Sequence, residues 1–566
     1  VFHYEGEVNP RSSDLISRMY PDQKLFGKLC RQETARSGAN VGYPSLRYFE
    51  ITKEHYAKMP VVLCEFAHSM ENSLGNFSEY TDAFERYDHL CGGFIWDFVD
   101  QSIHKKDEQG DRWLHGEDYM ERFDPKNGLK NRLTVGGNRY FCANGIVAAN
   151  RTPHPAAVEV KKCYQVLRVR ALDLSKGEFA LENRQMFCDL SKYRVLWSLE
   201  ADGTALQSGE IPAEQFARTA PGDNATITLP PEVKHDGLAT LTFHWVLKSN
   251  TRWADAGYEQ AFDQFVLQNR TPMAQIPQPG KLTLTTIGNT AVVEGDGFYL
   301  RFEDGALASW QREGEEFVAR AFLPNYYRAM TDNDRGLSNF VPQLLPFLSE
   351  SAWKRKNTRL TGTMFAAAEG DTVAIHVRWH HPFFRREETV YRVFSDGTVE
   401  LLHSASTRRK KPIRIGLQGT LTKGFETVEW VGRGPEENYL DRKSGSPLGR
   451  YRRAIAEMEH PYMRPQENGA RCDVETLLLE GTGKQFFVER LSDSLQFSAW
   501  NYSQRALDDA EHQHELIREP ETTLSLDGAM RGVGGDLPGV LELHPPYELK
   551  AKTEYRLHLR IRADKR

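Results

Sequence analysis

The sequence predicts a multidomain protein in which an α/β part is followed by two all-β parts. Three observations predict this. Two apolar strand patterns flank a helical pattern between residues 61 and 96, alternating strand patterns begin near residue 166, and a proline-rich stretch occupies residues 269–280. A chain of 566 residues is long enough for about three or four domains. Its 40% hydrophobic and 27% charged residues are ordinary for a globular protein.

The first part, residues 1–165, has the pattern of an α/β domain. The apolar run at 61–64 is typical of a strand buried on both faces, and a polar turn through Asn72 and Gly75 follows it. A second apolar run at 94–96 predicts the next strand. Between the runs, aromatic residues recur at helical spacing, at Phe77, Tyr80, Phe84 and Tyr87. This order predicts a βαβ unit, and residues 2–4 and 15–17 predict two further strands.

Two all-β domains are predicted after the α/β part. Residues 166–268 alternate apolar and polar side chains, as at 193–198 and 241–246, which favours a small β-sandwich. Residues 269–280 contain three prolines and are interpreted as a linker. Residues 281–566 return to strand patterns and predict one large β-sandwich. The clearest of its strands are at 283–286, 373–377, 398–402 and 556–561.

Charge and cysteine content narrow the function classes. The net charge of −6 offers no basic excess for a nucleic-acid backbone, so we expect no nucleic-acid partner. No run of about 18 apolar residues occurs, so we expect no membrane span. The seven cysteines are odd in number and form no C-x-x-C pair, which favours reduced thiols in a cytoplasmic protein over a disulfide framework.

The most informative stretch for chemistry is VVLCEFAHSMENSLGNF. Glu65 directly follows the apolar strand, and His68 and Asn72 lie just beyond it. A carboxylate at the carboxyl end of a strand faces the active-site mouth of a parallel α/β sheet or barrel. The alternative is a solvated carboxylate at the start of a loop.

The second stretch, CGGFIWDFVDQS, places Trp96 at the end of the next strand. Trp96 would therefore line the same mouth and could stack on a sugar, unless it is a core tryptophan. Asp97 and Asp100 could act as acids or form strand-end salt bridges. Glu65, His68 and Trp96 together indicate carbohydrate cleavage, which normally needs two carboxylates. The second carboxylate cannot be located from spacing.

These motifs resemble those of glycoside hydrolase family 2 β-galactosidases of bacterial type. The resemblance runs through the whole chain. It continues in FCANGIVAANRTPHPAAVEVKK at 141–162 and in segments of the last domain, namely TDNDRG, GRGPEENYLDR, RPQENGARCDV and FSAWNYS. It implies the carboxyl-terminal half of a (β/α)₈ barrel over 1–165, an immunoglobulin-like sandwich over 166–268 and the terminal β-galactosidase sandwich over 281–566.

The resemblance also implies roles for individual residues. Glu65 would be the nucleophile, and Tyr20 would contact it. His68 and Trp96 would bind the galactose. A sodium or potassium ion that meets the sugar would be held by the side chain of Asn144 and the backbone carbonyl of Phe141. From the residues alone, Asn144 could instead cap the turn before Gly145.

The chain also departs from the family pattern. It has no N-E-S-G-H-G motif, which carries the family's acid/base glutamate, and it lacks the Mg²⁺ ligands and an aspartate of the sodium site. Residues 532–540, GVGGDLPGV, contain no tryptophan for an aglycone platform. We therefore expect a homo-oligomeric hydrolase of lactose-like β-galactosides that needs an amino-terminal half or complementing chain. The alternatives are a family 2 hydrolase for another galactoside and a non-enzymatic carbohydrate-binding sandwich protein.

Overall fold

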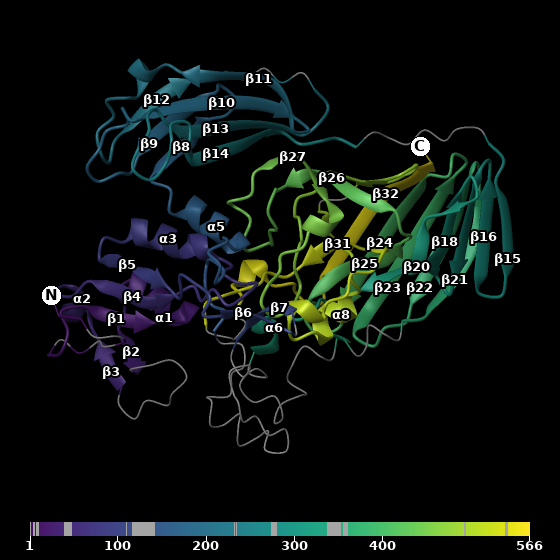
Figure 1. Ribbon diagram of the computed structural model, residues 1–566, viewed down its shortest axis with the longest axis horizontal. Helices are drawn as coiled ribbons and strands as arrows, with labels where there is room; N and C mark the ends of the chain where they lie inside the picture. The colour runs from purple at the N-terminus through teal and green to yellow at the C-terminus, as the bar shows by residue number, and fades with distance from the viewer. Residues whose placement is uncertain are drawn as a thin grey trace.

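The computed structural model has an α/β part, a small β-sandwich and a large β-sandwich (Figure 1). The helix at residues 155–163, labelled α5, lies where these parts meet. The structure describes residues 2–3, 6, 9, 11–38, 48–108, 110–115, 142–230, 233, 235–272, 280–336, 353–354, 360–491, 494–537 and 542–565. Within these residues, strands far outnumber helices. No described helix is long and apolar enough to cross a membrane.

The α/β part is built on a parallel sheet whose described strands lie in the order β1–β4–β5. These strands are β1 (Ile16–Met19), β4 (Val61–Phe66) and β5 (Leu90–Ile95). The helix α3 (Phe77–Arg86) connects β4 to β5, which confirms the predicted βαβ unit. Phe77 and Tyr80 of α3 pack on Phe66, with ring centroids 5.6 and 5.2 Å away.

Smaller elements complete the α/β part. They are α1 (Gln23–Cys30), β2 (Ala35–Gly38), β3 (Tyr48–Ile51), α2 (Lys53–Tyr56), β6 (Ile103–Asp107), β7 (Gly110–Leu114) and α5 (Pro155–Cys163). Asp22 caps α1, because its side chain accepts a hydrogen bond from the Leu25 amide at 2.7 Å. The strand predicted at 15–17 is present as β1. The strand predicted at 2–4 is wrong at Phe2 and His3, which are irregular, and Tyr4 lies outside the described residues.

The small sandwich pairs two antiparallel sheets, in the orders β11–β10–β13–β14 and β12–β9–β8. Its strands are β8 (Leu167–Asp173), β9 (Glu178–Asn183), β10 (Tyr193–Ala201), β11 (Thr204–Ile211), β12 (Asn224–Thr228), β13 (Ala239–Leu247) and β14 (Glu259–Gln268). Alternate residues of β10 and β13 point inward and surround the buried Trp245. The alternating patterns in the sequence therefore correspond to real strands.

The large sandwich has two sheets of nine described strands each. The first contains β15 (Thr283–Ile287), β16 (Thr290–Gly295), β17 (Phe298–Glu303), β18 (Ala306–Arg312), β20 (Val318–Asn325), β25 (Arg414–Leu421), β31 (Thr522–Met530) and β30 (Gln496–Trp500), with β19 (Glu315–Glu316) beside β18. The second contains β21 (Gly362–Glu369), β22 (Thr372–Trp379), β23 (Phe384–Phe394), β24 (Val399–Thr407), β32 (Glu554–Lys565), β29 (Lys484–Arg490), β28 (Thr476–Gly481), β26 (Phe425–Arg433) and β27 (Leu448–Ala454). Two short helices are α6 (Asp332–Arg335) and α8 (Gln504–Asp509).

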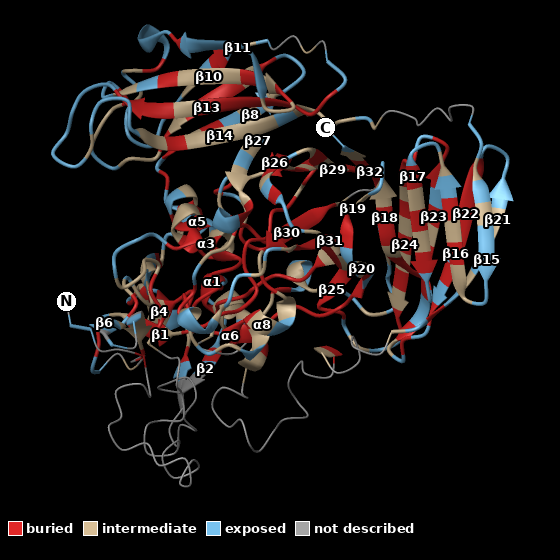
Figure 2. Ribbon diagram, turned by 45° about the vertical axis from the view of Figure 1, so that its right-hand side comes forward, coloured by how far each residue is buried: buried red, intermediate tan, exposed pale blue. Residues whose placement is uncertain are grey.

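The apolar core lies between these two sheets, and buried residues continue from it toward the α/β part (Figure 2). Helix α5 contacts both sandwiches. Lys162 donates to Asp263 of β14 at 2.7 Å. The Glu159 carboxylate accepts hydrogen bonds from Ser444 and from the Gly445 amide, at 2.6 and 2.9 Å. The α/β part is thus fixed against the terminal sandwich, which brings distant segments to the ends of its strands.

Candidate active site

Three residues singled out in the sequence meet where the parallel strands end. Met19 pairs with Glu65, and the next amide, that of Tyr20, donates to the Glu65 carbonyl at 2.9 Å. On the other side of β4, the Trp96 amide donates to the Phe66 carbonyl at 3.3 Å. Carboxyl ends of parallel strands share one edge of a sheet. Tyr20, Glu65 and Trp96 therefore lie side by side at that edge.

Tyr20 and Glu65 form a hydrogen-bonded pair. The Tyr20 ring is buried, and its hydroxyl donates to the Glu65 carboxylate. The pKa of Tyr20 is raised far above its usual value, first by burial and then by this hydrogen bond and the charge of Glu65. Tyr20 therefore stays protonated and orients the carboxylate as a donor. Glu65 itself is only partly buried, so a ligand can reach it.

His68 lies beside this pair in a fully buried position. Its ring meets the Tyr20 ring edge-on, with centroids 5.8 Å apart. Burial lowers the pKa of His68 to about 3. The imidazole is therefore neutral near pH 7 and has one donor nitrogen and one acceptor nitrogen. That state suits hydrogen bonding to hydroxyl groups better than proton donation.

Trp96 is partly exposed and is not one of the buried core residues, which favours a binding role over that of a core tryptophan. The adjacent Asp97 accepts a hydrogen bond from Gln101 at 2.7 Å, and burial raises the pKa of its carboxyl. The charge of Asp97 also raises the pKa of Tyr20. Asp97 thus belongs to the same site as Glu65.

Asn144 is buried and is tied to this edge through its backbone. Its carbonyl accepts a hydrogen bond from the Asp97 amide at 2.8 Å. Asp100 accepts from the Gly145 amide at 2.7 Å and pairs with His154 at 2.7 Å. Asp100 is therefore engaged in a strand-end pairing with His154, which matches one of the two roles expected for it.

One residue predicted from the sequence has no described position. Phe141, the second expected cation ligand, lies outside the described residues. Among the described residues, no group of three or more His, Cys, Asp or Glu side chains could hold a metal ion.

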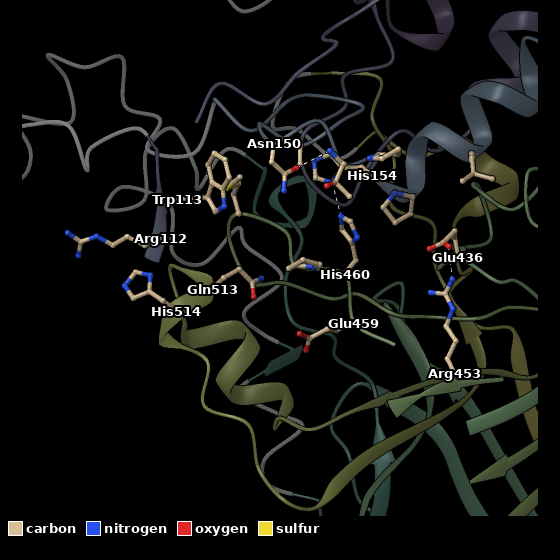
Figure 3. A pocket seen from close by; sticks show the side chains of 17 residues that line it. Arg112, Trp113, Asn150, His154, Glu436, Arg453, Glu459, His460, Gln513 and His514 are labelled. Carbon is tan, nitrogen blue, oxygen red and sulfur yellow. Dashed lines mark hydrogen bonds and ion pairs between the residues drawn. The ribbon is translucent and has the colours of Figure 1, made fainter. Parts of the chain in front are cut away.

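A cavity of about 880 Å³ lies between the α/β part and the terminal sandwich, but Glu65 and Trp96 do not line it (Figure 3). Its polar groups are largely paired with one another. The Nδ1 atom of His154 lies 2.7 Å from the Nε2 atom of His460, and Arg453 donates a hydrogen bond to Glu436 at 2.7 Å. The catalytic candidates therefore lie at the strand ends rather than in this cavity.

Sequence reasoning missed the surroundings of the segment after Glu65. The expected polar turn through Asn72 and Gly75 is present as an irregular segment between β4 and α3, but residues 67–76 are all buried. Glu71 in this segment accepts hydrogen bonds from the amides of Met463 and Arg464, each at 3.0 Å. No local signal could have revealed these partners, because nearly 400 residues separate them from Glu71.

Three family models match successive parts of the chain. Residues 1–169 match the glycosyl hydrolases family 2 TIM barrel domain. Residues 179–268 match β-galactosidase domain 4, and residues 294–561 match the β-galactosidase small chain. The three ranges follow the order of the three structural parts.

Curated relatives agree with these models. The chain is 31% identical over 518 residues to a β-galactosidase of Priestia megaterium, which covers 89% of this chain and 48% of that protein. It is 32% identical over 529 residues to a β-galactosidase of Vibrio cholerae, with the same two shares. It is 31% identical over 574 residues to β-galactosidase 2 of Enterobacter cloacae, and that match covers 97% of this chain and 52% of that protein.

The chain thus spans about half the length of the curated relatives it matches. A solved galactose 1-epimerase from Lactobacillus acidophilus covers 51% of this chain at 8% identity with a TM-score of 0.28, which is too low to support an argument. The family models and the curated relatives do support one. The chain belongs to glycoside hydrolase family 2, in which it matches the β-galactosidases.

Proposed function

We propose that this chain carries the nucleophile of a retaining β-galactosidase that hydrolyses terminal β-D-galactosides such as lactose. One observation carries the proposal. The Glu65 carboxylate stands partly exposed at the carboxyl end of β4, and the buried hydroxyl of Tyr20 donates to it. A carboxylate held in this way can attack a sugar ring from a fixed direction.

The reaction would proceed in two displacements. A Glu65 oxygen attacks the anomeric carbon, the bond to the leaving oxygen breaks, and an acid protonates that oxygen. Water then attacks the galactosyl ester, gives its proton to the same group and frees Glu65. Two inversions retain the configuration. Tyr20 orients Glu65, neutral His68 hydrogen-bonds sugar hydroxyls, and Trp96 packs against the ring.

The acid/base would come from an amino-terminal half of the barrel, either in a longer chain or in a complementing one. The described alternatives are less suitable. Asp100 is committed to His154 and the Gly145 amide. Asp97 is the remaining candidate, because burial raises the pKa of its carboxyl and could keep a proton available. The same half would supply the Mg²⁺ ligands, and the assembled enzyme would be a homo-oligomer.

We further propose that Na⁺ or K⁺ binds at Asn144 and at the carbonyl of Phe141. Asn144 fits this role because it is buried in a loop whose backbone is fixed by Asp97 and Asp100. Hard cations prefer oxygen ligands, and amide oxygens are of this kind. When bound, the ion would help to hold a sugar hydroxyl at the site.

Covalent trapping tests the proposed nucleophile. A β-galactoside with fluorine at carbon 2 and a dinitrophenolate leaving group needs no acid to depart, so it probes Glu65 alone. We expect one added fluorogalactosyl group, located by peptide mapping on Glu65. The matching glucoside is the control and should react far more slowly. Labelling on another carboxylate would refute the assignment.

The alternatives would give different results in the same assay. A carbohydrate-binding sandwich would bind galactose without release of dinitrophenolate. A family 2 hydrolase for another galactoside would be labelled at Glu65 and yet turn over lactose poorly beside other galactosides.

A further inference from the structure

The segment that follows the nucleophile is an unusual loop. Residues 67–76, here called the nucleophile loop, join β4 to α3 and include His68. All ten of its residues are buried. Loops normally run over the surface, where water satisfies their backbone groups. A buried loop must find these partners within the protein.

The terminal sandwich supplies many of them. The Gly75 amide donates to the Gly534 carbonyl at 2.5 Å, and the Asn76 amide donates to the Asp441 carbonyl at 2.7 Å. The side chain of Asn72 donates to the Glu467 carbonyl at 2.6 Å. The nucleophile loop is thus held by segments that follow it by more than 350 residues.

Arg442 lies at the centre of this contact. Its guanidinium donates to the Asn72 side-chain oxygen at 2.9 Å and to the Ser73 carbonyl. It also pairs with Glu437 at 2.8 Å, and both of these charged side chains are almost completely buried. Arg442 therefore connects the nucleophile loop to a carboxylate of the terminal sandwich. The guanidinium makes these bonds from two nitrogens held in one plane, whereas a lysine would have to make all of them from a single nitrogen.

The two backbones also approach too closely for side chains to separate them. A Cβ atom on Gly75 would lie 1.8 Å from an oxygen of Asp441. A Cβ atom on Gly535, whose φ is +138°, would lie 2.7 Å from the Leu74 amide and 3.0 Å from the His68 carbonyl. The loop therefore has little space in which to shift. Its position, and that of His68, depends on the sandwich.

We propose that Arg442 is a positioning residue, which fixes the nucleophile loop and thereby holds His68 and the end of β4 in place. The catalytic consequence rests on the function proposed above. Arg442→Gln would leave the Asn72 oxygen, the Ser73 carbonyl and Glu437 short of donors in a buried site. Unpaired buried groups are costly, so the loop would open locally to reach water.

Hydrogen–deuterium exchange of the whole 566-residue chain tests the positioning itself and needs no activity. We expect Arg442→Gln to speed exchange of the peptide that covers residues 67–76 by about tenfold or more. Arg442→Lys should give an intermediate rate. The matched control is Arg560→Gln, because Arg560 is also buried and paired with two carboxylates, Glu400 and Glu489, on strands remote from the loop. Unchanged exchange of the loop in Arg442→Gln would overturn the proposal.

A milder variant covers the case in which Arg442→Gln also exposes the sandwich strands. Tyr439→Phe removes one hydroxyl, which accepts a hydrogen bond from Asn72 at 2.9 Å. A smaller rise in exchange, confined to the same loop, would uphold the role of this contact. If the loop exchanges equally fast in Tyr439→Phe and in the unsubstituted chain, that result would count against a role of the terminal sandwich in holding the loop.

The trapping reaction provides the catalytic readout. We expect Arg442→Gln to slow labelling of Glu65 by about tenfold or more, and Arg560→Gln to leave it within about twofold of the unsubstituted chain. A loosened loop with unchanged labelling would remove the catalytic part of the inference. Failure of the unsubstituted chain to be labelled, even when it is assembled with its amino-terminal half, would instead count against the proposed function, while the exchange result would still judge the loop contact.

Discussion

Four carboxylates near the strand ends differ in what surrounds them. Glu65 is partly exposed and receives the Tyr20 hydroxyl. Asp100 is paired with His154, and Glu71 is buried against two backbone amides. Burial and the charges of Asp100 and Asp332 raise the pKa of Glu71 well above its usual range. Asp97 is partly buried and accepts a hydrogen bond from Gln101, and burial raises the pKa of its carboxyl. Glu65 is therefore the carboxylate best placed to act as a nucleophile.

We predict that Glu65→Gln abolishes turnover in the complete enzyme and leaves folding intact. The amide has nearly the same shape and still accepts the Tyr20 hydroxyl, but it is a very poor nucleophile. The loss should reach several orders of magnitude in kcat, with an unchanged melting temperature. A variant that keeps more than about a tenth of the rate would remove Glu65 from this role.

We predict that Trp96→Ala weakens galactose binding far more than it destabilises the fold. A stacked ring contributes about a kcal/mol or more to binding, and Trp96 is only partly buried. The control is Trp245→Ala, which empties a fully buried position and should cost about 3–5 kcal/mol. Titration calorimetry with galactose and melting curves of both variants separate the two effects. A melting temperature that falls as far in Trp96→Ala would make it a core residue.

At the scale of elements, the spacing of β4 and β5 sets the distance between Glu65 and Trp96. Gly93 of β5 pairs with Leu63 of β4. A Cβ atom on Gly93 would lie 2.8 Å from a ring carbon of Phe66 and 2.9 Å from the Leu63 Cβ. The absence of a side chain at this position therefore allows the two strands to pair.

We predict that Gly93→Ala pushes β5 away from β4, destabilises the α/β part by about 1–3 kcal/mol and slows trapping at Glu65. Gly27→Ala in α1 is the control, because its nearest neighbour is the flexible end of Arg31 at 3.1 Å. Alanine should stabilise that helix by about 0.5–1 kcal/mol. Chemical unfolding and trapping rates of both variants check the prediction. Equal behaviour of the two would contradict it.

The two sheets of the terminal sandwich are joined by a buried hydrogen-bonded trio. The hydroxyl of Tyr326, which follows β20, donates to Glu387 of β23 and lies 3.2 Å from a nitrogen of His403 in β24. Burial raises the pKa of Glu387 to about 8, although the hydrogen bond from Tyr326 opposes the rise. Burial lowers the pKa of His403 to about 4. Both groups are therefore uncharged near neutral pH.

This trio predicts that stability falls as pH rises toward about 8. Between the ordinary carboxyl pKa of 4.5 and about 8, the folded chain holds a proton on Glu387 that the unfolded chain has released. Stability therefore falls as pH rises through this window, by about 1.4 kcal/mol per pH unit for a single group. Glu387→Gln should reduce the slope of stability against pH. Glu388→Gln, on the partly exposed face of β23, should leave that slope unchanged. Hydrogen exchange of β23 and β24 peptides in urea between about pH 6.5 and 8 measures it. Parallel slopes in Glu387→Gln and the unsubstituted chain would disprove it.

At the scale of the whole molecule, the described parallel sheet ends at β1 on one side and β5 on the other. Phe94 and Phe98 beside the β5 edge are 66% and 67% exposed. Open edges of parallel strands and exposed aromatic rings favour association. The sheet therefore has the character of a surface that pairs with further barrel strands.

We predict that these 566 residues alone hydrolyse β-galactosides poorly, because we expect an amino-terminal half to supply the acid/base and the strands that complete the barrel. A fragment that carries the first half of the barrel should restore activity. The measurement is release of nitrophenol from a nitrophenyl β-galactoside, with and without that fragment. Full activity of the lone chain would point to a carboxylate such as Asp97 as the acid, and Asp97→Asn would then abolish it.

The sequence by itself determined the local structure around the candidate site. The apolar run before Glu65, the helical aromatic spacing and the glycine pair before Phe94 predicted β4, α3 and β5, because these patterns reflect burial of neighbouring residues. Strand-end geometry then placed Glu65 and Trp96 together. The motifs around them were enough to predict the family.

Only the tertiary structure decided how the loop after Glu65 is held. The sequence placed Asn72 in a polar turn, and the structure buries it against Tyr439 and Arg442. Asp100 could have been an acid, and its pairing with His154 decided otherwise. The physical reason is the same in both cases. Burial of a polar group is tolerated only where partners satisfy it, and these partners come from segments that no local pattern can pair.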